Sequence, residues 1–116
     1  MSSDVLNPVD IEQHISGISE RIAKGVRVVT EAEKEAKRLR REFDLAFAHA
    51  FKNADGSIPD KKYQAQIETM QQREAAENAE VAFNYAERTA WALKDELSAF
   101  QSIGASVRAM YEAVRS

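Results

Sequence analysis

The side chains that most often carry out chemistry are few in this sequence. His14 and His49 stand apart, and neither has a second histidine four residues away. The chain has no cysteine, which excludes disulfides, thiolate metal ligands and a cysteine nucleophile. Glycine-rich phosphate loops and Gly-x-Ser-x-Gly elbows are also absent from the sequence. We therefore expect no catalytic residue, no metal, no cofactor and no small-molecule substrate, and we predict that the protein is not an enzyme.

The most distinctive charged feature is a basic cluster between residues 34 and 41. Within these eight residues Glu35 is the single acid, and five residues are cations: Lys34, Lys37, Arg38, Arg40 and Arg41. The steps 34–37–38–41 place four of these cations on one helical face, with a spacing that can follow a phosphate backbone. The cluster predicts polyanion binding through Lys34, Lys37, Arg38 and Arg41.

An intramolecular interpretation of the same cluster stays open. If the chain turns back near residue 56, antiparallel pairing sets residues 34–41 opposite roughly 71–78. That stretch contains Glu74 and Glu77, and Glu80 follows it. These acids would neutralise part of the cluster and leave some positive surface. Glu31 and Glu33 lie one turn before the cluster as well.

Trp91 is the third feature with a possible chemical role. It lies three residues from both Arg88 and Lys94, and an exposed tryptophan between cations can stack on a nucleic-acid base. The alternative is a partly buried tryptophan that only packs. Arg88, Lys94 and Arg108 are candidate supplements to the basic cluster.

These residues must be positioned by helices. The chain has 116 residues, which suits one domain, and only 4 Gly and 2 Pro, too few for the regular turns of a β-sandwich or barrel. No apolar run approaches the roughly 20 residues of a membrane span. The first ten residues show neither the basic nor the apolar region of a signal peptide. We expect a soluble cytoplasmic protein, in the host cytoplasm if the chain is phage-encoded, with no membrane contact.

The periodicity of apolar residues divides the chain into segments. Residues 1–6 lack periodicity and are predicted to be a flexible tail. Asn7 and Pro8 form a helix start, and a stripe follows over 8–29: Ile11, Ile15, Ile18, Ile22, Val26 and Val29. Gly17 and Gly25 weaken this N-terminal helix by roughly 1 kcal/mol each relative to Ala.

The rest of the chain reads as a helical hairpin. Thr30 and Glu33 have the form of a capping box, which marks either a new helix or a position inside a continuous one. Residues 30–53 form the first hairpin arm, 54–59 the turn around Asp55-Gly56, and 60–115 the second arm. The predicted fold is a single all-α domain: a long antiparallel, coiled-coil-like hairpin with a short N-terminal helix and an oligomerising C-terminal helix.

The last helix carries a stripe of large apolar residues. Its members recur at helical spacing: Leu93, Leu97, Phe100, Ile103, Val107, Met110 and Val114. One Ile-rich helix is too short to cover this stripe along its whole length, and identical stripes complement each other under rotational symmetry. We therefore predict a homo-oligomer held together by these seven residues.

The order of these features resembles the UvsY-like recombination mediator proteins of tailed phages. The resemblance covers roughly residues 30–112 and is carried by 37–51, the Asp55-Gly56 tip, Tyr85, 91–97 and the tail with Gln101, Ser102 and Arg108. It implies a ring-forming, non-enzymatic protein that binds single-stranded DNA. It also implies that the protein helps to load a recombinase onto strands covered by single-strand-binding protein.

Two other classes remain open. The first is a phage structural, assembly or chaperone-like protein whose coiled coil binds only protein, and the second is a host-directed inhibitor that masks a partner helix. The formal net charge of -3 contrasts with the basic excess of most DNA-binding domains.

Overall fold

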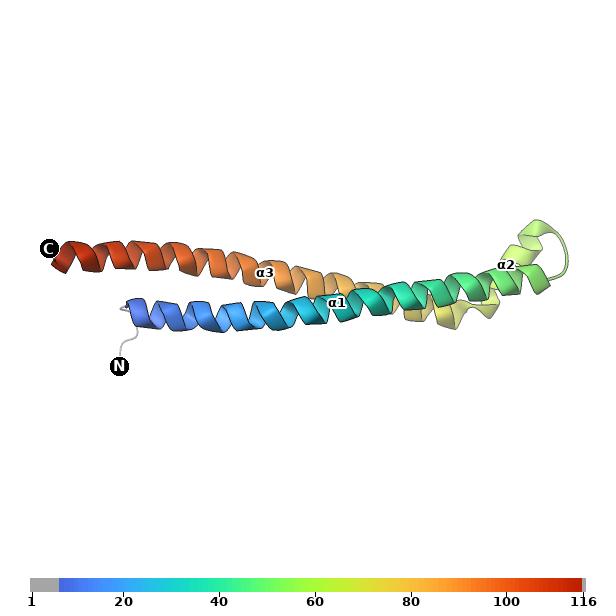
Figure 1. The fold of residues 1–116 in the computed structure, drawn as a ribbon. Helices are drawn as coiled ribbons and strands as arrows, with labels where there is room; N and C mark the ends of the chain where they lie inside the picture. Colours follow the sequence, from blue (N-terminus) through green and yellow to red (C-terminus); the bar gives the residue numbers. More distant parts are fainter. Residues whose placement is uncertain (1–6, 116) are drawn as a thin grey trace, which may run out of the picture. The chain divides into compact units, whose positions relative to one another are not determined.

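The computed structural model describes residues 7–115, so the tail predicted at residues 1–6 lies outside the described part. Three helices account for 94 % of this part, and it contains no strand (Figure 1): α1 (Pro8–Asn53), α2 (Ile58–Glu68) and α3 (Met70–Arg115). The expected all-α class with a helical hairpin is confirmed.

α1 begins where the sequence predicts. The Asn7 side chain accepts a hydrogen bond from the Asp10 backbone N–H at 3.0 Å and donates one to the Asp10 carboxylate at 2.8 Å. Pro8 occupies the first helical position, where its missing N–H leaves no partner unsatisfied.

α1 then runs without a break to Asn53, so the predicted segments 8–29 and 30–53 are one helix. Thr30 lies inside this helix and does not start a new one, so residues 7–53 contain no separate short N-terminal helix. No Gly or Pro follows Gly25 before the turn, so nothing in this stretch stops the helix.

The turn between α1 and α2 comprises residues 54–57, inside the predicted 54–59. Gly56 adopts φ +105°, a conformation that favours glycine. The Ser57 hydroxyl caps α2 by accepting a hydrogen bond from the Asp60 N–H at 3.3 Å. The Gln64 side chain donates to the Asp55 carbonyl at 2.9 Å and ties α2 to the loop.

The second arm is two helices, because the chain leaves helical geometry at Thr69. This residue has φ -110° and ψ 17°, and its buried hydroxyl donates to the Ala65 carbonyl at 2.7 Å. A threonine that bonds back to a carbonyl four residues earlier often bends a helix. No Gly or Pro lies at this break between α2 and α3.

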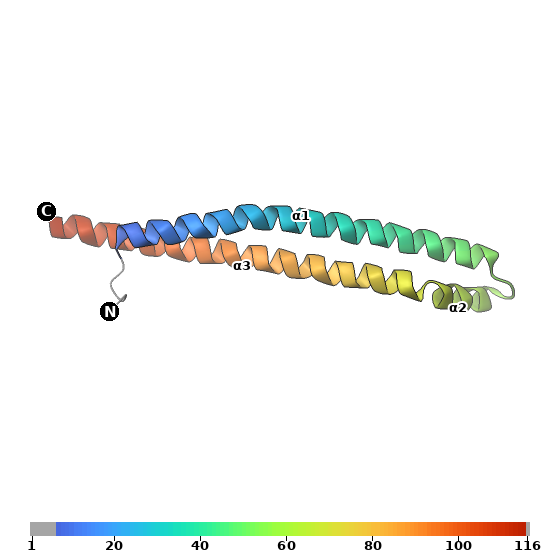
Figure 2. The same cartoon turned by 90° about the horizontal axis from the view of Figure 1, so that it is seen from below.

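The described chain forms two compact units, which we treat separately. Unit 1 pairs residues 7–27 of α1 with residues 87–115 of α3, and unit 2 comprises residues 28–86. In each unit α1 and α3 lie side by side in opposite directions (Figures 1 and 2).

Unit 1 has the more apolar core of the two. Ile11, Ile18 and Leu93 are buried, and the rings of His14 and Phe100 stack with their centroids 5.2 Å apart. The buried positions of unit 2 are small residues: Ala54, Ala65, Thr69 and Ala76. Half-buried phenylalanines of α1 accompany them, among them Phe47, whose ring lies 6.2 Å from Phe43 and 6.4 Å from Phe51.

Candidate interaction surfaces

The cations of the basic cluster pair with acids of their own helix. Lys34 lies 3.8 Å from Glu31, Lys37 lies 3.9 Å from Glu33, and Arg40 lies 3.4 Å from Asp44. All of these side chains are exposed, and exposed ion pairs typically contribute only about 0–1 kcal/mol. The lysine pairs are long, so they hold their cations weakly.

Arg38 is held more tightly than its neighbours. Its guanidinium donates two hydrogen bonds to Glu35, at 2.6 and 3.0 Å, and one to Glu42 at 2.6 Å. The hydrogen bond from Arg38 lowers the pKa of the Glu35 carboxyl, and the same contact raises the pKa of Arg38. This fork fixes the guanidinium along α1.

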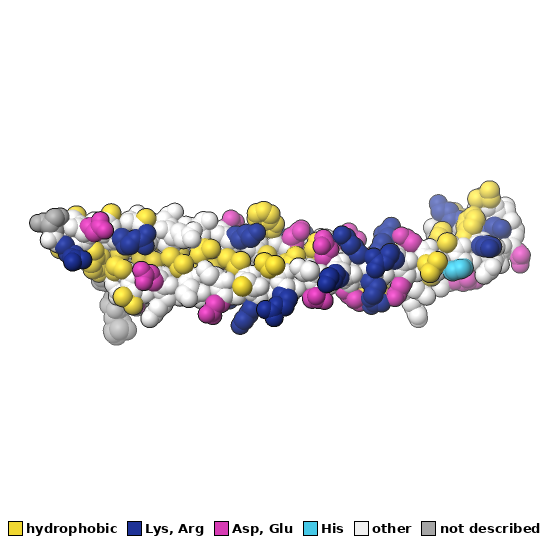
Figure 3. All heavy atoms as spheres, viewed as in Figure 1, with side chains coloured by type: hydrophobic (Ala, Val, Ile, Leu, Met, Phe, Trp, Pro, Cys, Tyr) yellow, Lys and Arg dark blue, Asp and Glu magenta, His cyan; other side chains and the backbone are white. Residues whose placement is uncertain are grey.

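The neutralising acids therefore come from α1 itself, and Glu31 and Glu33 are among the expected ones. In the described part of the chain, no ion pair joins the cluster to Glu74, Glu77 or Glu80. Over residues 31–44 five acids balance the five cations. Figure 3 shows the resulting mixture of dark blue and magenta side chains over this stretch.

The remaining predicted DNA-binding residues lie in different surroundings. Within residues 7–115, the cluster's Arg41 has no ion pair, and neither do Arg88 and Arg108 of α3. Trp91 is 61 % exposed, and the Lys94 ammonium lies 5.0 Å from its ring centroid. The structure thus brings Trp91 and Lys94 together, while the cluster belongs to unit 2 and Arg88, Lys94 and Arg108 belong to unit 1.

A groove of about 270 Å³ lies between α1 and α3 within unit 2. Its apolar floor includes the half-buried Phe83, and its charged wall includes Lys37 and Arg40. The groove is also lined by Glu33, Ala36, Ala76, Glu80 and Asn84. The two cations and two acids balance, so the groove has no net charge.

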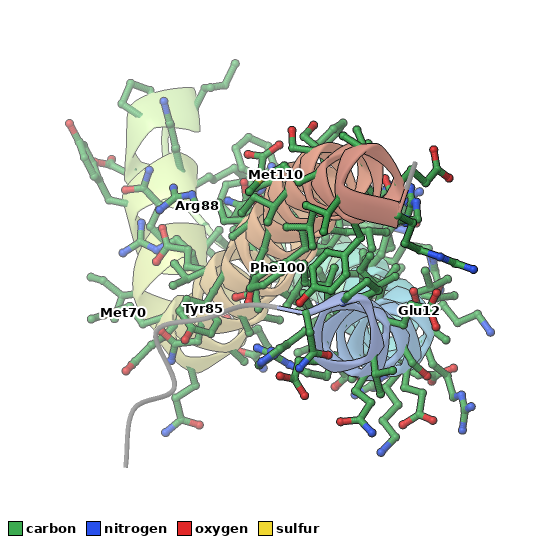
Figure 4. All side chains as sticks on the ribbon, turned by 90° about the vertical axis from the view of Figure 1, so that its left-hand side faces the viewer. Glu12, Met70, Tyr85, Arg88, Phe100 and Met110 are labelled. Atoms are coloured by element: carbon green, nitrogen blue, oxygen red, sulfur yellow. The ribbon has the colours of Figure 1, made fainter. Side chains whose placement is uncertain are left out.

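The predicted oligomerisation stripe divides between the core of unit 1 and its surface. Leu93 is buried, and Leu97, Phe100 and Val107 are half-buried. Figure 4 shows Phe100 between α1 and α3 and Met110 pointing away from α1. Ile103, Met110 and Val114 are exposed. The N-terminal part of α1 thus uses much of the stripe within the chain, and the rest remains available for self-association.

A second group of apolar residues lies on the outer side of unit 2, and the sequence alone does not show that these residues are exposed. We define the α2–α3 outer stripe as Tyr63, Ile67, Met70, Glu74, Glu77 and Val81. Its four apolar members are from 54 % to 69 % exposed. In Figure 4, Met70 and Tyr85 both lie on the side of α3 that faces away from α1. The alternating steps of four and three from Tyr63 onward signal this stripe in the sequence.

The outer stripe exists because α2 turns its small residues inward. Ala65 and Thr69 are buried, so the large side chains of Tyr63 and Ile67 must face outward on the opposite side of α2. The periodicity of apolar residues in the sequence does not reveal which of two stripes on a helix is covered by another helix. The stripe of small residues faces inward here because small side chains let the helices approach closely.

Other kinds of site find no support in residues 7–115. No group of three or more His, Cys, Asp or Glu side chains is arranged to hold a metal ion there. No described helix is long and apolar enough to cross a membrane. Comparison with protein-family models, curated proteins and solved structures finds no match to this chain.

Proposed function

We propose that this protein is a non-enzymatic structural, assembly or chaperone-like protein that works through helical protein–protein contacts. The observation that carries this proposal is the α2–α3 outer stripe, whose large apolar side chains face solvent in unit 2. Contiguous exposed apolar side chains on a small protein commonly mark a protein contact. The steps of four and three residues from Met70 to Val81 on α3 fit a helix as the partner surface.

The electrostatics support protein rather than DNA as the main partner. Residues 31–44 carry no net charge, and four of the five cluster cations already lie beside a carboxylate. A phosphate backbone would have to displace these carboxylates and bring its own negative charge next to them. The net charge of -3 also disfavours DNA binding, because it repels the negatively charged phosphate backbone.

A recombination mediator that binds single-stranded DNA is the second candidate, and the groove of unit 2 favours it. Lys37 and Arg40 lie beside the half-buried Phe83 in this groove, and phosphate would have to take the places of Glu33 and Asp44 next to them. Arg41 lacks an ion pair in the described chain and adds a cation available for phosphate. In this candidate a phage-encoded protein would act in the host cytoplasm and contact a recombinase or single-strand-binding protein.

Fluorescence anisotropy with labelled single-stranded DNA at low and high salt distinguishes the two candidates. The assembly proposal predicts no binding at low salt with tens of micromolar protein. Binding that weakens at high salt, and that disappears in the Lys37→Glu/Arg41→Glu variant with its helix content intact, would replace the assembly proposal by the mediator. Each lost phosphate contact should reduce the salt slope by about one unit.

A further inference from the structure

We infer that the partner of the α3 part of the outer stripe, from Met70 to Val81, is α1 of a second copy of this chain. This inference rests on the proposed protein-binding function and names its partner. The receiving surface is the α1 outer stripe, which we define as Lys34, Arg38, Arg41 and Leu45. All four residues are exposed in unit 2, and Leu45 is an apolar side chain 61 % exposed on an otherwise polar face.

The two stripes have the same spacing in opposite directions. From Lys34 to Leu45 the members follow one another at steps of four, three and four residues. Read backward from Val81 to Met70, the part of the outer stripe on α3 shows the same succession of steps. Tyr63 and Ile67 take no part, because the break at Thr69 sets α2 at an angle to α3 (Figures 1 and 4). Two helices with matching four–three rhythms in antiparallel orientation bring their stripe residues together layer by layer.

Charge and size complementarity fix the register of this contact. In the matching register Arg41 faces Glu74 of the second copy and Arg38 faces its Glu77. Neither glutamate forms an ion pair within the described chain, and Arg41 has none either. Arg38 would keep its own carboxylate partners and add a third.

One apolar pair coincides in the same register. Leu45 faces Met70 of the second copy, and both side chains are more than half exposed in the single chain. The remaining pair sets the stem of Lys34 against Val81, with its ammonium free to reach solvent.

Within one chain the groove of unit 2 already places residues 33–40 of α1 beside residues 76–84 of α3. The proposed contact repeats this relation between copies, so the two unit 2 hairpins meet without an offset along their helices. The two stripes lie on different helices, which makes the contact heterologous. Every copy then offers its α1 surface to one neighbour and its α3 surface to another. Assembly can therefore continue beyond a dimer.

Cysteine pairing tests the contact directly, because the natural chain has no cysteine. A mixture of Leu45→Cys and Met70→Cys chains under mild oxidation should give a disulfide between the two variants. Each variant alone should stay unlinked, because a heterologous contact does not bring like residues together. Leu45→Cys mixed with Ala82→Cys is the matched control, because Ala82 is exposed on another side of α3.

Charge exchange gives a second readout, measured by sedimentation over a range of concentrations. Arg41→Glu or Glu74→Arg alone should raise the dissociation constant of self-association about tenfold. The double variant should return it to within about threefold of the natural chain. Arg41 and Glu74 make no ion pair in the described chain, so restoration points to contact between copies.

Three results would overturn the inference: a monomeric natural chain at tens of micromolar, linkage no greater than in the Ala82 control, or no restoration in the double variant. These results leave the proposed function in place, since another protein can still occupy the stripe. Conversely, salt-dependent DNA binding would remove the proposed function without affecting the contact between copies.

Discussion

Gly104 of α3 lies directly against Ile11 of α1, the one large side chain of residues 7–115 that is fully buried. A Cβ at Gly104 would lie 3.1 Å from the Ile11 Cγ2 atom, closer than ordinary contact. This approach sets the register of unit 1 and explains a glycine in the middle of a helix. The small residue lets the two helices pack closely over Ile11.

Gly104→Ala should therefore destabilise the protein. The added methyl group gains roughly 0.5–1 kcal/mol of helix propensity but must push the fully buried Ile11 side chain aside, which typically costs 1–3 kcal/mol. We expect a net loss of about 1 kcal/mol in the free energy of unfolding, measured by urea denaturation. An unchanged or raised unfolding midpoint would show that Ile11 can move away at little cost.

Gly17→Ala and Gly25→Ala should have the opposite effect. A Cβ at either position would meet no atom within 4 Å, so only the helix propensity of α1 changes. Each substitution should raise the free energy of unfolding by roughly 0.5–1 kcal/mol. Thermal melts followed by circular dichroism at low protein concentration test this. A loss of stability at either site would mean that another surface approaches the helix there.

The Arg38–Glu35 contact predicts a pH dependence. Arg38 lowers the pKa of Glu35 from 4.5, so the carboxylate is favoured in the folded state. The resulting stabilisation is present above pH 4.5 and is lost as the pH falls through the lowered value. Glu35→Gln should thus reduce the melting temperature at neutral pH and have no effect in strong acid. Glu31→Gln is the control and should change less, since Glu31 meets Lys34 only at 3.8 Å.

The sequence predicts most of the helix ends because their causes are local. Asn7 with Pro8, Gly56, and Ser57 with Asp60 each satisfy a specific need of the backbone at a helix start or turn. The break at Thr69 escapes prediction, since its threonine is common inside helices and only the burial of its hydroxyl shows its role.

The candidate surfaces are less predictable for a different reason. The cluster pairs with acids three or four residues away on α1. Glu31 and Glu33 could be expected from the sequence, but an argument from facing helices gives weight to Glu74 and Glu77 and misses Glu42 and Asp44. Two apolar stripes share the second arm, and the burial of Ala65 and Thr69 decides which one faces α1 in unit 2. That choice depends on interhelical distance and not on hydrophobicity, so no count of apolar residues reveals it.

The C-terminal stripe yields the last prediction, because its members now fall into two groups. Leu97 is half-buried in unit 1, and Met110 is 65 % exposed. Leu97→Asp should destabilise unit 1, since it places an unpaired charge at a half-buried position there; the loss in the free energy of unfolding should be about 2–4 kcal/mol. Met110→Asp should leave the melting temperature of dilute protein within about 1 °C, because its side chain already faces solvent.

Light scattering on the Met110 variant then tests self-association through the C-terminal helix separately from folding. If the exposed part of this stripe joins copies, Met110→Asp should give a smaller species at the same concentration, with helix content unchanged by circular dichroism. If copies meet only through the α1 and α2–α3 outer stripes, the variant should keep its mass while Arg41→Glu loses it. A Leu97→Asp protein as stable as the natural chain would contradict the packing of unit 1 itself.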